Sequence, residues 1–322
     1  MPRLKVIQLD DPTDISPWGQ AVLRIVGARH DVSVFDYEQA PGPQVEAADV
    51  IIDVGGEHLE PQVLAEARQL KLWQIIAVGV DGVDLSPATR RGIPVANTPG
   101  FTSAAGLSDA AIMFMIMLVK RYHEGAEFIR HNDLHTMANE ELEGQTLGLI
   151  GFGASGQALA HKAIVFGMRI MIIEPMPIVP EVLDQIKPVF VGTPDQMDKV
   201  IAASDFVSLH LPLMDETEKI IDARRISLMK PTACLINVAR GRLVDEPALH
   251  QALLEERIGG IGTDVFAYNQ TAGSSKLLDH PRFVALPHVS GTTTGAFRRR
   301  AQVALENVDR IGEGLEPKHR IA

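Results

Sequence analysis

Cysteine is almost absent from this sequence, which has one such residue, Cys234, among 322. A single thiol excludes an internal disulfide framework and a cysteine-rich zinc site, and this fits a reducing compartment. Cys234 lies in the apolar run 233–236, which favours buried packing over nucleophilic catalysis. We therefore expect a cytoplasmic protein.

Long hydrophobic runs are absent as well. The most apolar segment covers residues 110–119 and is followed by Lys120 and Arg121, so it has about half of the ~20 residues that cross a membrane. The first apolar run, residues 4–9, is too short for a secretory signal and predicts a strand. Segment 110–119 predicts a buried helix whose methionines fill an irregular core or a subunit contact, and no membrane partner is expected.

Positive charge is in short supply. The formal net charge is −11 and the sequence pI is near 5.5, which argues against a general surface for nucleic acid or anionic membranes. The three arginines at 298–300 have no interleaved aromatic residues and predict a solvated or subunit-facing surface. An anionic substrate would have to be held by local cations.

Alternating strand and helix patterns run along the whole chain. Hydrophobic residues make up 46% of the composition, so the chain can bury a large core, and its length favours two domains. Short β-branched runs separated by helical patterns are typical of parallel α/β units. The predicted strands are 4–9, 32–35, 50–54, 72–78 and 93–96, followed by 147–150, 168–173, 188–191, 206–209, 233–238, 260–265 and 283–286. The second group gives about seven strands, enough for a doubly wound sheet.

The most informative pattern is GFGASG at residues 151–156, between the apolar run 147–150 and a helical pattern over 157–166. A glycine turn between strand and helix is typical of a dinucleotide site. Gly151 allows the tight turn, Gly153 lets the backbone approach a pyrophosphate, and Gly156 permits close packing of the helix. The positive end of the helix dipole then meets the phosphate charge.

An acidic residue, Glu174, follows the motif by about 20 residues and is placed to bind the adenine ribose hydroxyls. Pro175 and Met176 offer no arginine for a 2'-phosphate. The sequence therefore favours NAD over NADP.

The position of the glycine motif in mid-chain indicates the domain organisation. A dinucleotide fold needs no prelude of this length, so the first part of the chain should form a domain of its own. A last helix, over about 293–312, lies beyond the final strand and is expected to cross back to that domain. The turn sequences 97–100 and 287–291 are candidate hinges. We predict one domain from 1–99 and 290–322, and a second from 100–289.

Eight short motifs follow one another along the chain. They are VGVDGVD at 78–84, NTPG at 97–100, the glycine motif, SLHLP at 208–212, MKP at 229–231, NVARGRLVDE at 237–246, DVF at 264–266 and PHVSG at 287–291. In this order they resemble the D-2-hydroxyacid dehydrogenase family over nearly the whole length. The resemblance implies an α/β fold in which a Rossmann doubly wound parallel sheet is inserted into a second, flavodoxin-like α/β substrate domain. It also implies a homodimer.

The resemblance implies hydride exchange between NAD(H) and a small 2-hydroxy or 2-oxo acid. Arg240 matches the family arginine, whose planar fork can hold carboxylate and carbonyl oxygens together. His288 matches the family acid/base residue, and histidine suits proton transfer near neutral pH. The substrate carboxylate would lie on backbone amides of Gly55, Gly56, Val78 and Gly79, where bare backbone accepts an anion.

The resemblance also assigns cofactor contacts. Asp264 matches the residue that fixes the nicotinamide carboxamide, and His210 belongs to the loop beside the nicotinamide ribose. The full set is Val78, Gly151, Gly153, Ala154, Ser155, Gly156, Glu174, His210, Leu211, Pro212, Val238, Ala239, Arg240, Asp264, His288, Ser290 and Gly291.

Three other residues that could bind a ligand or a metal, Arg242, His131 and His135, are not expected to form a second site. Arg242 is favoured as a solvated side chain, with a contact to a second acidic group of the substrate as the alternative. His131 and His135 have helical spacing, but no carboxylate or cysteine pattern accompanies them, so a solvated face is favoured over a metal pair.

One departure from the family bears on the proton step. The family usually places a glutamate five residues after the aspartate of DVF, where this chain has Asn269. A carboxylate stabilises an imidazolium, whereas an amide can orient the ring without supplying charge. We count Asn269 with the catalytic residues and predict that reduction falls off at lower pH than in glutamate-bearing relatives. Two further departures are Ser108-Asp109, expected ahead of a helix, and residues 132–134, where many relatives carry a tryptophan.

Two alternatives to the dehydrogenase remain at this point. One is an NAD(H)-sensing interaction protein similar to the corepressors of the superfamily. The other is a formate- or phosphite-type dehydrogenase on the same scaffold, and formate enzymes carry an amide at the position of Asn269.

Overall fold

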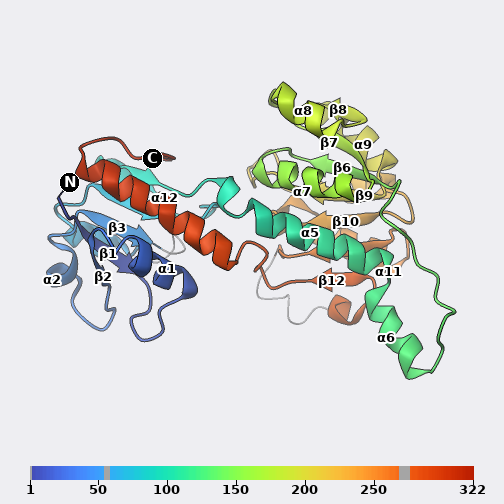
Figure 1. Ribbon diagram of the computed structural model, residues 1–322, viewed down its shortest axis with the longest axis horizontal. Coiled ribbons are helices and arrows are strands. Elements are labelled where there is room, and N and C mark those ends of the chain that lie inside the picture. Colours follow the sequence, from blue (N-terminus) through green and yellow to red (C-terminus); the bar gives the residue numbers. More distant parts are fainter. Residues whose placement is uncertain (1, 54–58, 268–275) are drawn as a thin grey trace. The chain divides into compact units, whose positions relative to one another are not determined.

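A computed structural model describes residues 2–53, 59–267 and 276–322 of the chain. The chain divides into two compact units, Met1–Ser103 with Thr292–Ala322, and Ala104–Gly291 (Figure 1). The chain crosses from one unit to the other at 103/104 and at 291/292. The crossings predicted from the sequence, at 99/100 and 289/290, lie within four residues of these. Gly55, Gly56 and Asn269 lie outside the described residues.

The first unit is built on a five-stranded parallel sheet of order β2-β1-β3-β4-β5. This is the flavodoxin-like order, in which the chain reverses direction across the sheet between β1 and β3. Its strands are β1 (Lys5–Leu9), β2 (Asp31–Val34), β3 (Val50–Asp53), β4 (Leu72–Ile75) and β5 (Val95–Ala96).

Successive residues of each strand in this sheet point to opposite faces and pack into two separate hydrophobic cores. Ile7, Leu9 and Ile51 pack with α2 (Pro41–Val45), α3 (Pro61–Glu66) and α4 (Ser86–Arg90). Residues of the opposite parity, such as Val6 and Ile52, pack with α1 (Pro17–Ile25) and the last helix, α12 (Thr294–Gly312). The sequence prediction that this last helix returns to the first part of the chain agrees with its packing on α1 and β4.

The second unit holds a seven-stranded parallel sheet of order β12-β11-β10-β9-β6-β7-β8. Its strands are β6 (Thr146–Ile150), β7 (Arg169–Ile173), β8 (Phe190–Gly192), β9 (Phe206–Leu209), β10 (Cys234–Asn237), β11 (Gly260–Thr263) and β12 (Phe283–Ala285). The order reverses between β6 and β9, which is the Rossmann arrangement with its ligand crevice at the carboxyl ends of these strands. The predicted fold class is therefore confirmed.

Helices cover both faces of the seven-stranded sheet. On one face lie α5 (Ala104–Val119) and α7 (Ala154–Val165), which pack against each other side by side (Figure 1). On the other face, the core includes residues of α9 (Met197–Ala203), α10 (Ala223–Leu228) and α11 (Glu246–Leu254). Cys234 lies in the first of these cores, and burial raises the pKa of its thiol to about 12. The thiol is therefore a packing group, as the sequence predicts.

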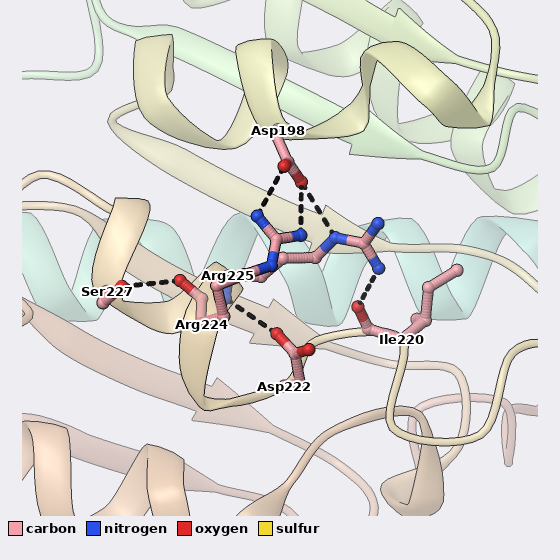
Figure 2. Close-up of polar contacts among 6 residues, drawn as sticks. All are labelled: Asp198, Ile220, Asp222, Arg224, Arg225 and Ser227. Carbon is pink, nitrogen blue, oxygen red and sulfur yellow. Dashed lines mark hydrogen bonds and ion pairs between the residues drawn. The ribbon is translucent and has the colours of Figure 1, made fainter.

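An ion-pair network joins α9 to α10 (Figure 2). Asp198 accepts two hydrogen bonds from Arg224, at 2.6 and 3.1 Å, and one from Arg225 Nε at 3.0 Å. Asp222 caps α10 by accepting from the Arg225 backbone amide, and Arg225 also donates to the Ile220 carbonyl. Hydrogen bonds from the two arginines lower the pKa of Asp198 to about 2.

Local predictions need correction at one strand and one helix. Strand 72–78 ends at Ile75, which forms the last residue pair with β3, opposite Asp53, and the chain then turns. The apolar helix begins at Ala104 rather than near residue 110, so Ser108 and Asp109 lie inside it. Ser108 satisfies its hydroxyl by donating to the Ala104 carbonyl, the local bond that lets a serine sit within a helix.

Helix α6 (Tyr122–Arg130) differs from the other long helices because none of its residues is buried. It follows α5 and, with the segment after it, reaches away from the seven-stranded sheet (Figure 1). The remaining short helix of this unit is α8 (Pro180–Ile186). Within the described ranges, no helix is long and apolar enough to cross a membrane.

Candidate active site

The glycine turn between β6 and α7 has the geometry that the motif predicts. Gly151 has φ +91°, and a Cβ there would lie 2.6 Å from the His210 carbonyl oxygen. A Cβ on Gly156 would lie 2.6 Å from the Gly151 carbonyl oxygen. Side chains at either position would push the turn away from β9 or the helix away from the turn.

The middle glycine of the turn, Gly153, borders open space. A Cβ on Gly153 would meet no atom within 4 Å, and Gly153 is the N-cap of α7 without a side-chain cap. The first-turn amides, including those of Ala154 and Ser155, therefore face an open position at the positive end of a 12-residue helix. These residues fit a dinucleotide pyrophosphate.

Glu174 follows β7 and holds the glycine turn from the neighbouring strand. Its Oε2 accepts from the Phe152 amide at 2.7 Å, and its Oε1 accepts from the Met176 amide at 3.2 Å. Each carboxylate oxygen can accept a further hydrogen bond, so this arrangement is compatible with ribose hydroxyls. The carboxylate also disfavours a phosphate at the same place.

His210 is the first residue after β9, and its carbonyl lies against the glycine turn. Its Nε2 lies 2.9 Å from Ser208 Oγ, and its Nδ1 lies 3.0 Å from Ser155 Oγ. Burial lowers the pKa of His210 to about 3, so the ring is neutral near pH 7. The structure thus connects two predicted cofactor residues, Ser155 and His210.

The loop after β10 carries Arg240 and is shaped by Asn237, a residue to which the sequence analysis assigned no role. The Asn237 amide accepts from the Ala239 N–H at 3.0 Å and donates to the Arg240 carbonyl at 2.9 Å. These two bonds fold the Val238–Arg240 backbone, and the Arg240 guanidinium donates to the Ala239 carbonyl at 2.8 Å. An asparagine at the end of an apolar strand is a turn signal that could have marked this role.

The hinge segment after β12 carries His288 and is held by Asp264. Asp264 is 1% exposed, and its two oxygens accept from the amides of Val289 at 2.8 Å and Ser290 at 2.9 Å. His288 is exposed and has φ +59°, a left-handed conformation that is uncommon for a residue other than glycine. Asp264 therefore fixes the backbone next to His288, a role beyond the carboxamide contact that the resemblance implies.

Arg240 and His288 share one edge of the sheet with the glycine turn. Their loops follow β10 and β12, and the glycine turn follows β6, all at the carboxyl ends of parallel strands. Leu211 and Pro212 follow β9 at that edge, where the Pro212 carbonyl accepts from Thr217 Oγ1 at 2.8 Å. Gly291 is the last residue of this unit.

In the first unit, Val78 and Gly79 lie in the turn after β4. The Val78 carbonyl accepts from the Asn97 side chain at 2.7 Å, and the Ala77 carbonyl accepts from the Thr98 amide at 3.0 Å. The NTPG motif therefore holds this turn. From the sequence, the motif was expected to be a hinge and a part of the family resemblance, with no contact to this turn.

The remaining candidates make ordinary surface contacts. Arg242 pairs with Glu218 through two hydrogen bonds at 3.2 and 2.9 Å, with both side chains well exposed. This agrees with a solvated arginine. His131 is exposed and bonded to the Glu127 carbonyl through Nδ1. Among the described residues, no group of three or more His, Cys, Asp or Glu side chains is arranged to hold a metal ion.

Comparison with known proteins identifies the family. A family model for the "D-isomer specific 2-hydroxyacid dehydrogenase, NAD binding domain" matches residues 112–290. Glyoxylate reductase from Thermococcus litoralis is 33% identical over 287 residues, covering 86% of this chain and 85% of the relative. Hydroxypyruvate reductase from Thermotoga maritima is 31% identical over 271 residues, covering 83% of this chain and 85% of the relative.

Among solved structures, D-lactate dehydrogenase from Aquifex aeolicus, complexed with NAD and lactic acid, is similar over 96% of each chain. The TM-score is 0.77 and the sequence identity is 25%. These matches favour a dehydrogenase over an NAD(H) sensor or a formate-type enzyme. The chain belongs to the D-isomer specific 2-hydroxyacid dehydrogenase family and is an NAD-dependent oxidoreductase of 2-hydroxy acids.

Proposed function

We propose that this enzyme reduces a small 2-oxo acid of the size of glyoxylate or hydroxypyruvate, with Arg240 and His288 as its catalytic residues. The observation that carries the proposal is that both residues lie at the edge of the seven-stranded sheet that also carries the glycine turn. The names of the reductase relatives support the substrate size. NADH, when bound, supplies the hydride that goes to the carbonyl carbon.

Arg240 binds the substrate and polarises its carbonyl. A guanidinium can donate to a carboxylate oxygen and a 2-oxo oxygen at once, and it stabilises the negative charge that develops on the carbonyl oxygen. The Asn237 turn supports this role because it fixes the backbone from which the side chain projects.

His288 donates the proton to the carbonyl oxygen during reduction and takes it back during oxidation. Its exposure supports this role because a proton must be resupplied from solvent after each turnover. Asp264 keeps the neighbouring amides in place, so the ring starts from a fixed backbone. The products of reduction are the 2-hydroxy acid and the oxidised cofactor.

The first unit, on this proposal, is the substrate domain. Backbone amides of Val78 and Gly79 hold the substrate carboxylate, with those of Gly55 and Gly56 as further donors. The bonds from Asn97 and Thr98 support this assignment because they keep the turn after β4 in one conformation.

Steady-state turnover tests the function. NADH oxidation would be followed with glyoxylate, hydroxypyruvate, pyruvate and a branched 2-oxo acid, in wild type and in Arg240→Lys and His288→Gln variants. Because general acid catalysis and oxyanion stabilisation each contribute about 10²-fold or more, we expect at least that loss of kcat/KM in each variant. Arg242→Lys is the matched control and should lose less than threefold.

Several outcomes would contradict the proposal. Binding of NADH without oxidation by any 2-oxo acid would indicate a sensor, and oxidation of formate or phosphite with NAD would indicate the other alternative. Equal turnover with NADPH would contradict the role of Glu174 in favouring NAD.

A cytoplasmic location also stays a prediction, supported by the single buried thiol of Cys234.

We also propose a homodimer formed through α5 and α6. Tyr122 and Ile129 of α6 are 65% and 69% exposed, and Leu134 just beyond it is 54% exposed. Next to this segment, a groove of about 970 Å³ runs along the amino ends of β6, β9 and β10. This edge lies opposite the glycine turn, so a second copy there would leave the cofactor edge open.

A further inference from the structure

Arg300, in the second turn of α12, is a buried cation that the reaction described above does not use. Its side chain is 9% exposed and stacks over the Trp18 ring at 4.2 Å. Its Nη1 donates to the Ile76 carbonyl at 3.3 Å, and its buried Nε has no hydrogen-bond partner. Burial lowers the pKa of Arg300 to about 10, which leaves it charged near pH 7.

No carboxylate neutralises this charge in the part of the chain that the structure describes. Arg300 is in none of the ion pairs found there. The buried Asp10, after β1, takes its hydrogen bonds from Gln8, Ser16 and the Asp11 amide instead. A buried charge without an opposite charge destabilises a fold, and stacking on an aromatic ring offsets only part of that cost.

The packing by itself does not require an arginine. Next to Arg300, the side chains of Ile76, Ala301 and Trp18 belong to one hydrophobic core, and Phe297 packs against Trp18. A buried polar pair between α12 and β4, Asn307 with Gln74, satisfies itself by a hydrogen bond of 2.6 Å. One long hydrogen bond to a carbonyl is all that the guanidinium contributes to the backbone. A methionine of similar length would fill the space without burying a charge.

The position of Arg300 suggests what its charge is for. Ile76 is the first residue after β4, and Val78 and Gly79 follow in the same turn. Arg300 therefore reaches the carboxyl end of a parallel strand, the edge at which open α/β sheets bind ligands. Arg299, which donates to the Thr102 carbonyl at 2.9 Å, adds a second positive charge beside it.

We propose that Arg300 is a positioning residue of the substrate-carboxylate site: it holds the turn after β4 from behind and supplies a fixed positive charge for the anion on the Val78 and Gly79 amides. The proposal rests on the proposed function of that turn. Arg300 is buried and Val78 and Gly79 are half-buried, so the effective dielectric constant between them is lower than that of water and a fixed charge acts on a bound anion more strongly. Arg300 then distinguishes anionic 2-oxo acids from neutral carbonyl compounds.

The test removes the charge and compares an anionic with a neutral substrate. KM and kcat would be measured for glyoxylate and for its methyl ester in wild type and in Arg300→Met and Arg300→Lys variants. For Arg300→Met we expect the KM of glyoxylate to rise roughly 10- to 100-fold, as for loss of one charge near a bound anion, while the KM of the ester changes less than about threefold. Arg300→Lys keeps the charge and should recover most of the affinity.

Arg298→Met is the matched control, because Arg298 is exposed on the same helix and its loss changes the net charge equally. The Kd of NADH, read by fluorescence, should stay within about twofold in all variants. The melting temperature of Arg300→Met should be unchanged or higher, since a buried unpaired charge is removed. If Arg300→Met does not fold, Arg300→Gln keeps a donor for the Ile76 carbonyl without the charge.

An unchanged KM for glyoxylate in a folded, NADH-binding Arg300→Met protein would overturn the proposal. So would an equal rise in KM for acid and ester, or an equal effect of Arg298→Met. If the wild type oxidises NADH with no 2-oxo acid, the proposed function fails instead. The role of Arg300 can then still be tested by binding of the unreactive anion oxamate to the NADH-bound protein. We expect weaker binding of oxamate in the Met variant and near wild-type binding in the Lys variant.

Discussion

His210 and His288 show how single residues of one type take different roles in this enzyme. Burial lowers the pKa of His210 to about 3, and serine hydroxyls contact both ring nitrogens. A ring that stays neutral across the working pH range can position Ser155 but cannot act as an acid. His288 is exposed beside a fixed turn, so we assign the proposed proton step to it rather than to His210.

The residue expected to set that pH dependence is Asn269, which lies outside the described residues. We predict that Asn269→Glu moves the pH at which reduction falls off upward, because a carboxylate stabilises the protonated form of a neighbouring imidazole. The measurement is the pH profile of kcat/KM for a 2-oxo acid, with Asn269→Gln as the control that keeps an amide. Identical pH profiles for the wild type and the glutamate variant would contradict a role of residue 269 in setting the pH dependence.

At the scale of elements, we expect the β6–α7 turn to contain two glycines needed for folding and one needed for binding. We predict that Gly153→Ala leaves the melting temperature within a few degrees but raises the Kd of NADH at least about tenfold, because its Cβ enters open space where a phosphate would lie. Gly151→Ala should instead lower stability by about 1 kcal/mol or more, because of its φ of +91° and its contact with the His210 carbonyl. Calorimetry and NADH titration of both variants check this, and matching effects of the two substitutions on Kd would contradict it.

The α9–α10 network makes a prediction about stability and pH (Figure 2). The pKa of Asp198 is lowered from 3.8 to about 2, so its contribution is present above pH 3.8 and is lost as the pH falls through about 2. Because Asp198 is 42% exposed, we expect Asp198→Asn to lower the free energy of unfolding by only about 0.5–1 kcal/mol at pH 7. Denaturant unfolding at pH 7, 4 and 2 should show this difference shrinking. Asp184→Asn, an exposed position on α8, is the control, and a difference that persists at pH 2 would contradict the assignment.

At the scale of the whole molecule, the exposed apolar side chains of α6 predict the oligomeric state. We expect the wild type to sediment at twice the 35.0 kDa chain mass, and Tyr122→Ser with Ile129→Ser to shift it toward the monomer, because apolar area leaves an interface. The double variant Val165→Ser with Val179→Ser removes exposed apolar groups elsewhere and should stay dimeric. A wild type that is monomeric at all concentrations would refute the dimer.

Much of the fold could be predicted because its signals are local. Strand 206–209 matches β9 at both ends, and the glycine motif lies between β6 and α7 as expected. The errors occur where partners decide an element's length. Residues 76–78 continue the apolar run, but the last pair of β4 with β3 joins Asp53 and Ile75, so β4 ends there. Ala104 starts a helix although the segment 104–109 is less apolar than 110–119.

The sequence by itself determined the cofactor class and the order of the elements, because a strand, a glycine turn and an acidic residue act through neighbours in the chain. Only the tertiary structure decided which polar groups support them. Asp264 meets Val289 across 25 positions, His210 meets Ser155 across 55, and Arg300 meets Ile76 across 224. Such contacts follow from strand order and helix packing rather than from local pattern. The sequence therefore predicted a surface position for Arg300, whereas the packing of α12 on β4 buries it.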